Sequence, residues 1–454
     1  MNTNDTIIAP ATPPGEGGVA IVRISGAAAL PALLSYFKPA TATLPLKSHH
    51  LYYGTLEDQS GGLVDEVMAV YMAAPHSYTC DDVVEIQCHG SQQVVKSILK
   101  LYQVFGLRLA EPGEFTFRAY MNGRLDLSQA EAVASLIHAK TDSSRRLALN
   151  QIDGALSREI CSFADRLKQV LVLLEAWIDF PEEQLPTEDL DHISHTITEI
   201  KLKIQIITAS YSFGRVLSEG ASLLLIGEPN AGKSSLMNAL LGENRAIVTA
   251  VPGTTRDLLE EGLVIHGVPV RLIDTAGLCE SDDPVELEGI RRAENKLAQA
   301  DLILWVVDAT GDLTIENNYI FKLCDGLPVV RVLTKVDIVG CSSAVSPGCI
   351  PQYKVSSKTA EGLDDLRLGI ADFLTGGIQI SSESVMLTEQ RHYEVLLLCS
   401  AALARISDSL ATDVSLEFLA LDLREALYHL GQISGETTTD DILSGIFSGF
   451  CIGK

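Results

Sequence analysis

The chain has 454 residues, of which 46% are hydrophobic and 20% charged, and its formal net charge is −25. That length predicts about two to four domains, each able to bury a core of its own. The negative charge argues against tight nucleic-acid binding by this chain alone, because such binding gains from a strong basic patch that releases counterions. A basic partner protein could supply that patch.

Targeting signals and cysteine usage indicate the compartment. No segment reaches the run of about eighteen uncharged apolar residues that spans a bilayer. Residues 1–5 lack the basic and apolar regions of a secretory signal. The nine cysteines include no C-x-x-C pair and no zinc spacing, which suits reduced thiols. We therefore expect a cytoplasmic protein without a membrane span.

Residues 1–118 are predicted to form an α/β domain. Apolar and alternating patterns predict strands at 19–24 and 82–88, and helical spacing predicts a helix over 92–105. From about residue 119 the helical spacing dominates, and residues 119–217 are expected to be the first part of a helical domain. Pro181 is expected to end a helix within it.

Strand and helix patterns alternate over 218–378, as a doubly wound sheet requires. The strands are predicted at 222–226, 263–266, 269–273, 302–307 and 328–333. Residues 379–454 are predicted to be helical again. The expected fold class is therefore multidomain α/β plus all-α, with an α/β nucleotide domain inserted in a discontinuous helical domain.

The most informative motif is Gly227-Glu228-Pro229-Asn230-Ala231-Gly232-Lys233-Ser234, the full pattern G-x-x-x-x-G-K-[ST]. It follows a predicted strand and precedes a predicted helix, the context in which backbone N–H groups cradle phosphates. Lys233 can neutralise β/γ-phosphate charge, and the Ser234 hydroxyl can ligate Mg²⁺. The motif predicts that the chain binds a nucleoside triphosphate.

Two further segments suit the same site. Asp274 ends a predicted strand, where it can hold Mg²⁺ through a water, and the Gly277 amide can approach the γ-phosphate. The turn-rich loop 252–257 lies between the two motifs and carries hydroxyl groups. Thr255 from this loop is the predicted second Mg²⁺ ligand.

The base is predicted from Thr334-Lys335-Val336-Asp337 and from Ser356-Ser357-Lys358, which resemble the N-K-x-D and S-A-K pair of GTPases. Asp337 can accept the N1–H and N2–H₂ donors of guanine, which adenine lacks. Thr334 has no amide where the pattern has Asn, so its hydroxyl is expected to replace part of that contact. We expect guanine selectivity with some loss of affinity.

Two positions remain open from the residues alone. Leu278 stands where Ras-like proteins carry a water-orienting Gln, so another group must orient the water. Glu286 is a candidate, although an acidic helix start is commonly a solvated face. Asn230 can either favour the turn of the loop or ligate a monovalent cation.

The whole chain resembles the MnmE (TrmE) family. The segments that carry the resemblance are Asp5-Thr6-Ile7-Ile8-Ala9, Thr12-Pro13-Pro14-Gly15, Gly18 to Gly26, Pro112-Gly113-Glu114-Phe115-Thr116, Arg118 to Leu127, and Phe450-Cys451-Ile452-Gly453-Lys454. The resemblance implies an N-terminal tetrahydrofolate-binding and dimerisation domain over 1–118 and a Ras-like GTPase domain over 218–378.

The resemblance also implies an activity and partners. Members are homodimeric, potassium-dependent GTP hydrolases that act with the flavoprotein MnmG (GidA), in a heterotetramer, on the tRNA wobble uridine U34. They add an aminomethyl or carboxymethylaminomethyl group at C5, with a one-carbon unit from 5-formyl- or methylene-tetrahydrofolate. The partner carries FAD and, by inference, most of the grip on tRNA.

Site residues follow from the matching positions. Arg23, Glu85, Arg124 and Lys454 match contacts to formyl-tetrahydrofolate, and Asn230, Thr249, Val251 and Thr254 match potassium ligands. The potassium ion would lie where an arginine finger otherwise stabilises phosphate charge. Glu286 matches the water-orienting acid. Cys451 resembles a cysteine needed for modification, either as a nucleophile or as a structural thiol.

The predicted catalytic residues are thus Glu286, Lys233 and Cys451, and Ser234 and Thr255 are the predicted Mg²⁺ ligands. The residues predicted to bind GTP are Asn230, Ala231, Gly232, Lys233, Ser234, Ser235, Thr249, Ala250, Val251, Pro252, Gly253, Thr254, Thr255, Asp274, Thr275, Ala276, Gly277, Thr334, Lys335, Val336, Asp337, Ser356, Ser357 and Lys358. Two alternatives remain: a GTP-switched ribosome-assembly or regulatory factor, and a stand-alone folate-dependent transferase.

Overall fold

The computed structural model describes residues 5–41, 45–179, 187–242, 261–274, 297, 299–311, 326–339, 350–377, 385–412 and 415–453. The chain divides into two compact units, one of residues 1–137, 151–197 and 401–454, the other of residues 138–150 and 198–400. The predicted boundaries near 118, 217 and 378 stay predictions. Within the described ranges, no helix is long and apolar enough to cross a membrane.

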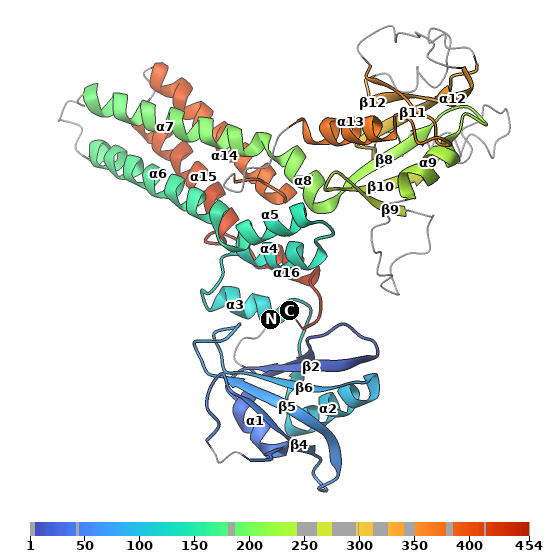
Figure 1. Ribbon diagram of the computed structural model, residues 1–454. Coiled ribbons are helices and arrows are strands. Elements are labelled where there is room, and N and C mark those ends of the chain that lie inside the picture. Colours follow the sequence, from blue (N-terminus) through green and yellow to red (C-terminus); the bar gives the residue numbers. More distant parts are fainter. Residues whose placement is uncertain are drawn as a thin grey trace, which may run out of the picture. The chain divides into compact units, whose positions relative to one another are not determined.

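The first unit contains a seven-stranded sheet in the order β3-β4-β5-β6-β2-β1-β7 (Figure 1). Its strands are β1 (Ile7–Pro10), β2 (Gly17–Ser25), β3 (Phe37–Pro39), β4 (Leu51–Glu57), β5 (Leu63–Met72), β6 (Val83–Gly90) and β7 (Arg108–Leu109). The strands predicted at 19–24 and 82–88 are confirmed as β2 and β6. The helix predicted over 92–105 is confirmed as α2 (Gln92–Phe105).

The two faces of this sheet differ. Val22, Ile24 and Ile86 are fully buried in one cluster with side chains of α1 (Ala29–Tyr36) and α2, so these helices cover one face. On the other face, Ile7 and Phe115 pack together, and Phe115 belongs to α3 (Glu114–Met121). That second face is where β2 and β6 direct the side chains between their buried residues, because neighbours along a strand alternate in direction.

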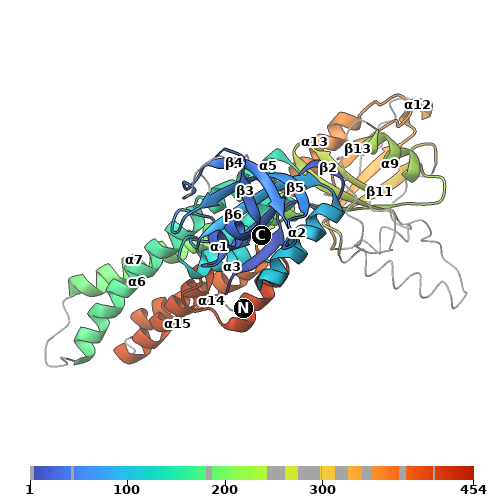
Figure 2. The same cartoon turned by 90° about the horizontal axis from the view of Figure 1, so that it is seen from below.

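Further helices complete the first unit. They include α4 (Leu127–His138), α6 (Ala155–Asp179), α15 (Leu416–Ser434) and α16 (Asp440–Ser448); α5 (Asp142–Ile152), α7 (Thr187–Ala209) and α14 (Gln390–Ala411) run across the division between the units. Helices α6 and α15 lie side by side (Figure 2), and each buries one apolar stripe. The predicted helical patterns are confirmed there, and Pro181, which is predicted to end a helix, lies outside the described residues.

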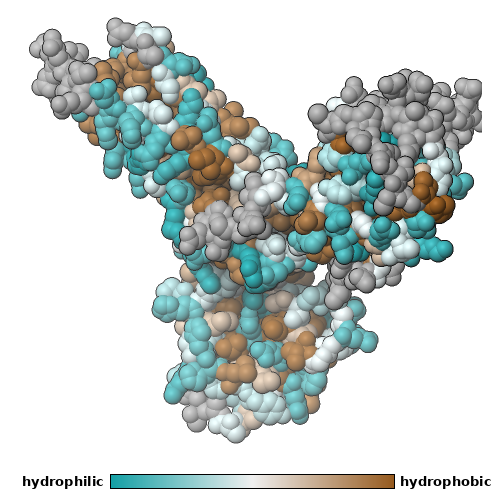
Figure 3. All heavy atoms as spheres, turned by 45° about the horizontal axis from the view of Figure 1, so that its top comes forward, coloured by the Kyte–Doolittle hydropathy of each residue, from teal (hydrophilic) through white to brown (hydrophobic). Residues whose placement is uncertain are grey.

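Apolar side chains also reach the surface of these helices (Figure 3). Val172 of α6 and Phe418 and Leu421 of α15 are exposed although each belongs to a helix with a buried stripe. Scattered exposed apolar residues are normal on a folded protein.

The second unit contains a six-stranded sheet in the order β13-β12-β11-β8-β10-β9. Its elements are α8 (Tyr211–Glu219), β8 (Ala221–Ile226), α9 (Lys233–Leu241), β9 (Glu261–Ile265), β10 (Val268–Asp274), β11 (Leu302–Asp308), β12 (Val329–Thr334), α12 (Val336–Val339), β13 (Gln352–Lys354) and α13 (Leu363–Thr375). All pairs are parallel except β9 with β10. The five predicted strands are confirmed with small shifts of their ends.

This sheet positions the phosphate motif. Strand β8 lies between β11 and β10 and is buried along its whole length, which explains its continuous apolar sequence. Parallel strands end at the same edge, so the loops after β8, β11 and β12 come together there. The expected combination of an α/β N-terminal domain, helices and an α/β nucleotide fold is confirmed.

Candidate functional site

The phosphate motif forms the loop between β8 and α9. A Cβ on Gly227 would lie 2.2 Å from the Val306 carbonyl oxygen, so no larger residue fits at the start of the loop. Gly232 has φ +96°, a left-handed conformation that favours glycine, and it precedes the first helical residue, Lys233. The two glycines therefore let the backbone turn tightly into the helix.

The Lys233 side chain folds back onto the start of the loop. Its Nζ donates hydrogen bonds to the carbonyl oxygens of Gly227 and Glu228, at 2.8 and 2.9 Å. Ser234 and Ser235 are exposed in the first turn of α9. A helix N-terminus with free N–H groups, an amine and a serine hydroxyl suits a phosphate with its Mg²⁺ ion. The residues that are described thus fit this pair of ligands.

Lys335 ties the end of β12 to the phosphate loop. Its Nζ donates to the carbonyl oxygen of Asn230 at 2.9 Å and to Oδ2 of Asp308 at 2.6 Å. Burial alone would raise the pKa of Asp308, but hydrogen bonds from Lys335 and Thr310 outweigh it and lower the pKa. Asp308 therefore stays ionised and holds the lysine. Our sequence reasoning missed Asp308, although its place at the carboxyl end of a parallel strand was a signal.

The predicted base-binding residues lie next to this network. Ser356 is fully buried and donates from Oγ to Oδ1 of Asp337 at 2.8 Å. The amides of Lys358 and Thr359 donate in turn to Ser356 Oγ, at 3.3 and 3.2 Å. Asp337 itself is exposed, so its carboxylate is oriented but open to a ligand. Ser357 and Lys358 lie in the same loop.

The structure thus brings together the phosphate loop, the segment 334–337 and the segment 356–358. Asp274 ends β10, and its backbone pairs with Leu225 of β8 beside the loop. The predicted site residues 249–255, 275–277 and Glu286 lie outside the described residues. Their assigned contacts to GTP, Mg²⁺ and potassium stay predictions.

A second cluster forms on the N-terminal sheet. Arg23 of β2 and Glu85 of β6 are directly paired across the strands, and Arg23 Nε donates to Glu85 Oε1 at 2.8 Å. The Arg23 guanidinium lies 5.5 Å from the centre of the Tyr78 ring, and that of Arg124 lies 5.1 Å from the same ring. Two of the predicted folate contacts, Arg23 and Arg124, therefore lie over one tyrosine, and a third, Glu85, is bonded to Arg23.

The C-terminal segment joins this cluster. Arg23 Nη1 donates to the Gly453 carbonyl oxygen at 3.2 Å, and Arg124 Nη1 donates to the Ser77 carbonyl oxygen at 2.7 Å. Lys454 lies outside the described residues, directly after Gly453. Cys451 is exposed, and its carbonyl oxygen accepts from the Gly113 amide at 3.4 Å. Our sequence reasoning missed Tyr78, which carries no recognisable motif.

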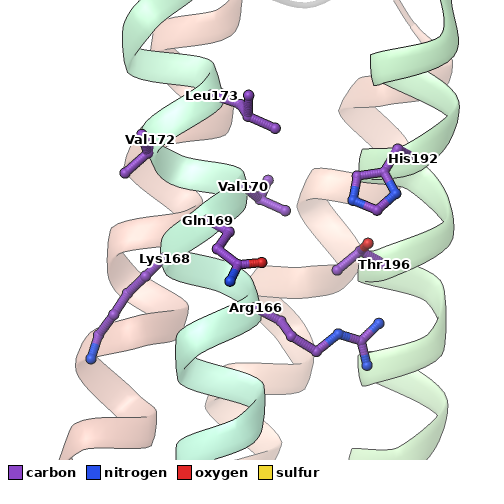
Figure 4. A pocket seen from close by; sticks show the side chains of 8 residues that line it. All are labelled: Arg166, Lys168, Gln169, Val170, Val172, Leu173, His192 and Thr196. Carbon is purple, nitrogen blue, oxygen red and sulfur yellow. The ribbon is translucent and has the colours of Figure 1, made fainter.

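Another hollow lies between α6 and α7 (Figure 4), with a volume of about 500 Å³. It is lined by Arg166, Lys168, Gln169, Val170, Val172, Leu173, His192 and Thr196. Figure 4 shows Arg166 reaching toward α7, whereas Lys168 points away from it. Of the predicted site residues that the structure describes, none lines this hollow.

Comparisons with known proteins decide the family. The family model described as "GTP-binding protein TrmE N-terminus" matches residues 6–124, and the "MnmE helical domain" model matches residues 127–451. The tRNA modification GTPase MnmE of Syntrophotalea carbinolica is 44% identical over 456 residues, covering 100% of both chains. The chain belongs to the MnmE family. The MnmE protein of Natranaerobius thermophilus is 41% identical, again over 100% of both chains.

The expected family is thus confirmed, and the MnmE relatives carry the activity in their name. The expectation of an enzyme that hydrolyses GTP in tRNA modification agrees with the name of these relatives. Among solved structures, the G domain of the FeoB iron transporter of T. maritima is 27% identical and covers 34% of this chain and 98% of its own, with a TM-score of 0.26. A score that low adds no argument to the MnmE assignment.

Proposed function

We propose that the chain is a GTP hydrolase that acts in tRNA modification. One observation carries the proposal. The loop between Gly227 and Gly232 places Lys233 at the start of α9, and the nearby Asp337 carboxylate is oriented by Ser356 but exposed to a ligand. Family membership supports GTP and Mg²⁺ as its ligands. Turnover of GTP but not ATP by the purified chain, with Mg²⁺ present, tests the proposal; equal turnover of both would contradict it.

Ser234 and Thr255 are proposed as Mg²⁺ ligands, with Asp274 acting through a water. Potassium is proposed between Asn230, Thr249, Val251 and Thr254, where its charge would offset that of the phosphates. The exposed position of Asn230 in the loop supports this assignment. GTP turnover should be much faster in KCl than in NaCl, and equal rates would remove potassium from the mechanism.

Glu286 is proposed to orient the attacking water, because Leu278 cannot do so. Glu286→Ala should leave the affinity for GTP unchanged within about twofold and slow hydrolysis by about two orders of magnitude or more. Glu280→Ala, in the same acidic stretch, is the matched control and should keep the wild-type rate. If Glu286→Ala hydrolyses GTP at the wild-type rate, another group orients the attacking water.

The Arg23 cluster is proposed to bind a formyl- or methylene-tetrahydrofolate. Two guanidinium groups and an aromatic ring suit a ligand that has an aromatic ring system and carboxylates. Calorimetry with 5-formyltetrahydrofolate should show binding that Arg23→Ala and Arg124→Ala weaken at least tenfold. Arg158→Ala is the control, because Arg158 forms an exposed ion pair with Asp153. Absence of binding would favour a GTP-switched assembly or regulatory factor.

A homodimer through the N-terminal sheet is also proposed. Cross-strand pairing places Leu51, Val70, Glu85 and Arg23 in one row on the face opposite α1 and α2. Tyr53 and Met68, in the next row, are 56% and 41% exposed. A second copy would cover these apolar side chains. Sedimentation should give a dimer, and Tyr53→Lys together with Met68→Lys should give a monomer.

The chemistry at C5 of the wobble uridine is proposed to require the flavoprotein MnmG, which would bring FAD and most of the tRNA contacts. The net charge of −25 supports this division, because it leaves little basic surface for tRNA. Wobble-uridine modification should appear only when both proteins are present. Product formed without the flavoprotein would favour a stand-alone folate-dependent transferase.

Cys451 is proposed to serve the modification step rather than GTP hydrolysis. Its exposure near the Arg23 cluster supports this role, because Gly453, two residues on, accepts from Arg23. Cys451→Ser should lower tRNA modification and keep GTP turnover. Full modification by that variant would make the thiol dispensable.

A further inference from the structure

Thr334 lies directly beneath the phosphate loop. It ends β12, it is 2% exposed, and a Cβ built on Gly232 would lie 3.3 Å from its Oγ1. The hydroxyl donates to the Ala231 carbonyl oxygen at 2.5 Å, within the loop itself. A second carbonyl, that of Val307, lies 3.2 Å away. The hydroxyl therefore faces acceptors from the loop after β8 and from β11.

A hydroxyl group carries one proton and two lone pairs. In the described part of the chain, both hydrogen-bonding neighbours of Thr334 Oγ1 are carbonyl oxygens, so its single proton is used on one of them, with the shorter contact to Ala231. The edge of guanine outside the N1–H and N2–H₂ donors presents N7 and O6, which are acceptors. A contact to either atom would need a proton that Thr334 has already given to the backbone.

We infer that Thr334 is a positioning residue for the phosphate loop and makes no hydrogen bond to guanine. This inference rests on the proposed GTP binding and deepens it. It departs from the expectation that the hydroxyl replaces part of an asparagine's contact to the base. Selectivity for guanine then depends on Asp337, whose carboxylate is oriented by Ser356, and N7 receives no donor from position 334.

An asparagine would behave differently at this position. Its amide has two N–H donors, so one can bond to the Ala231 carbonyl while the other stays available for N7. Thr334→Asn should therefore bind GDP about tenfold more tightly than the wild type, the effect of one added hydrogen bond. Thr334→Val should instead weaken binding, because it leaves the buried Ala231 carbonyl without its donor.

The test compares GDP with 7-deaza-GDP, in which a C–H replaces N7, by calorimetry on the full-length chain with Mg²⁺. The wild type should bind both nucleotides within about twofold, because position 334 does not contact N7. Thr334→Asn should bind GDP more tightly than the wild type and leave the affinity for 7-deaza-GDP unchanged. Thr334→Val should lower the affinity for both nucleotides by the same factor. Thr375→Val is the matched control, since the Thr375 hydroxyl donates to the Ala371 carbonyl in α13, at the end of that helix.

Each result decides the inference. The inference is overturned if the wild type binds 7-deaza-GDP about tenfold or more weakly than GDP. It is also overturned if Thr334→Asn gains the same affinity for both nucleotides. A wild type that binds neither GDP nor GTP would overturn the proposed function itself. Because Thr334→Val removes a buried hydrogen bond, the wild-type and Thr334→Asn measurements decide the matter if that variant does not fold.

Discussion

Single residues act in this protein largely by holding other groups in place. Asp337 is exposed, yet its carboxylate is oriented by the buried Ser356, which two backbone amides hold in turn. Lys335 does the same for the phosphate loop through Asn230 and Asp308. The groups that would touch the nucleotide are therefore preorganised by hydrogen bonds, which lowers the cost of ordering them on binding.

Asp337→Asn tests the assignment of the base. An amide can donate as well as accept, so it suits the extra carbonyl of xanthine and matches the two donors of guanine poorly. The variant should lose GTP affinity by about two orders of magnitude and gain affinity for XTP. Competition binding with GTP, XTP and ATP measures this. Unchanged preference for GTP would move base recognition to another residue.

Glu114 carries a prediction about pH. This fully buried carboxylate accepts from Arg108 at 2.6 Å and from Arg118 at 3.1 Å. Burial would raise its pKa, but the hydrogen bonds from Arg108, the Glu111 amide and Arg118 outweigh it and keep the pKa below the ordinary value of 4.5. A lowered pKa stabilises the fold above pH 4.5, and that stabilisation is lost as the pH falls through the folded pKa.

Glu114→Gln should therefore lower the free energy of unfolding by about 3 kcal/mol at pH 7, because buried Arg118 loses a charged partner. Below about pH 4.5 the difference from the wild type should shrink. Urea unfolding at several pH values measures both effects. Asp142→Asn is the control, since Asp142 forms exposed ion pairs with Arg145 and Arg146. A pH-independent loss in Glu114→Gln would contradict the ion-pair account.

At the scale of elements, helix α8 contacts two parts of the second unit: the start of the nucleotide sheet, and the segment around Leu387 that precedes α14. Arg215 of α8 forms an ion pair with Asp301, which also accepts from the Ser222 amide at the start of β8. The same helix also lies against Leu387 at Gly214, and the Leu387 amide donates to Oγ of Ser210, the residue before α8, at 3.2 Å. The helix therefore contacts Asp301 through an ion pair and Leu387 through a close approach of the two backbones.

Gly214→Ala tests this packing. A Cβ on Gly214 would lie 2.0 Å from the Leu387 carbonyl oxygen, a clash with backbone that cannot move away cheaply. We expect a loss of about 2 kcal/mol in unfolding free energy despite the better helix propensity of alanine. Gly445→Ala, in α16, meets no atom within 4 Å and should gain up to about 1 kcal/mol. Equal effects of the two substitutions would show that the close approach is unimportant.

At the scale of the molecule, the two ends of the first unit's sequence meet. A Cβ on Gly453 would lie 2.1 Å from the Pro10 carbonyl oxygen. The ring of Phe447 in α16 packs edge-on against that of Phe117 in α3, with the ring centres 5.2 Å apart. The C-terminal residues thus complete the cluster around Arg23. Because the contact closes a long loop, it depends on the fold of the whole unit.

Removing residues 451–454 should therefore separate binding from stability. The truncated chain loses the Gly453 carbonyl that accepts from Arg23 and should bind 5-formyltetrahydrofolate about tenfold more weakly. Its melting temperature should fall by only a few degrees, since α16 and Phe447 remain. Calorimetry and thermal unfolding measure the two effects, and GTP turnover should be unaffected. Unchanged folate affinity would place the C-terminal segment outside the site.

Patterns set by neighbouring residues were predictable, and contacts between distant residues were not. The loop 227–234, its flanking strand and helix, and the stripes of α6 and α15 follow from local backbone geometry and periodicity, so the sequence alone determined them. Strand β13 carried too weak a local pattern to be recognised, and the position of Asp308 at the end of β11 did not show which lysine it would hold. Arg23 and Glu85 were named by family resemblance, because neither has a local signal.

Tertiary structure decided which of these residues meet. Arg23 donates to groups that lie 62 and 430 positions away, on Glu85 and Gly453, a juxtaposition that only strand pairing and the return of the C-terminal segment produce. Likewise the sequence showed a hydroxyl at Thr334, but only the fold shows that Ala231 takes its proton. A hydrogen bond depends on position in space, and a residue's type alone does not determine its partner.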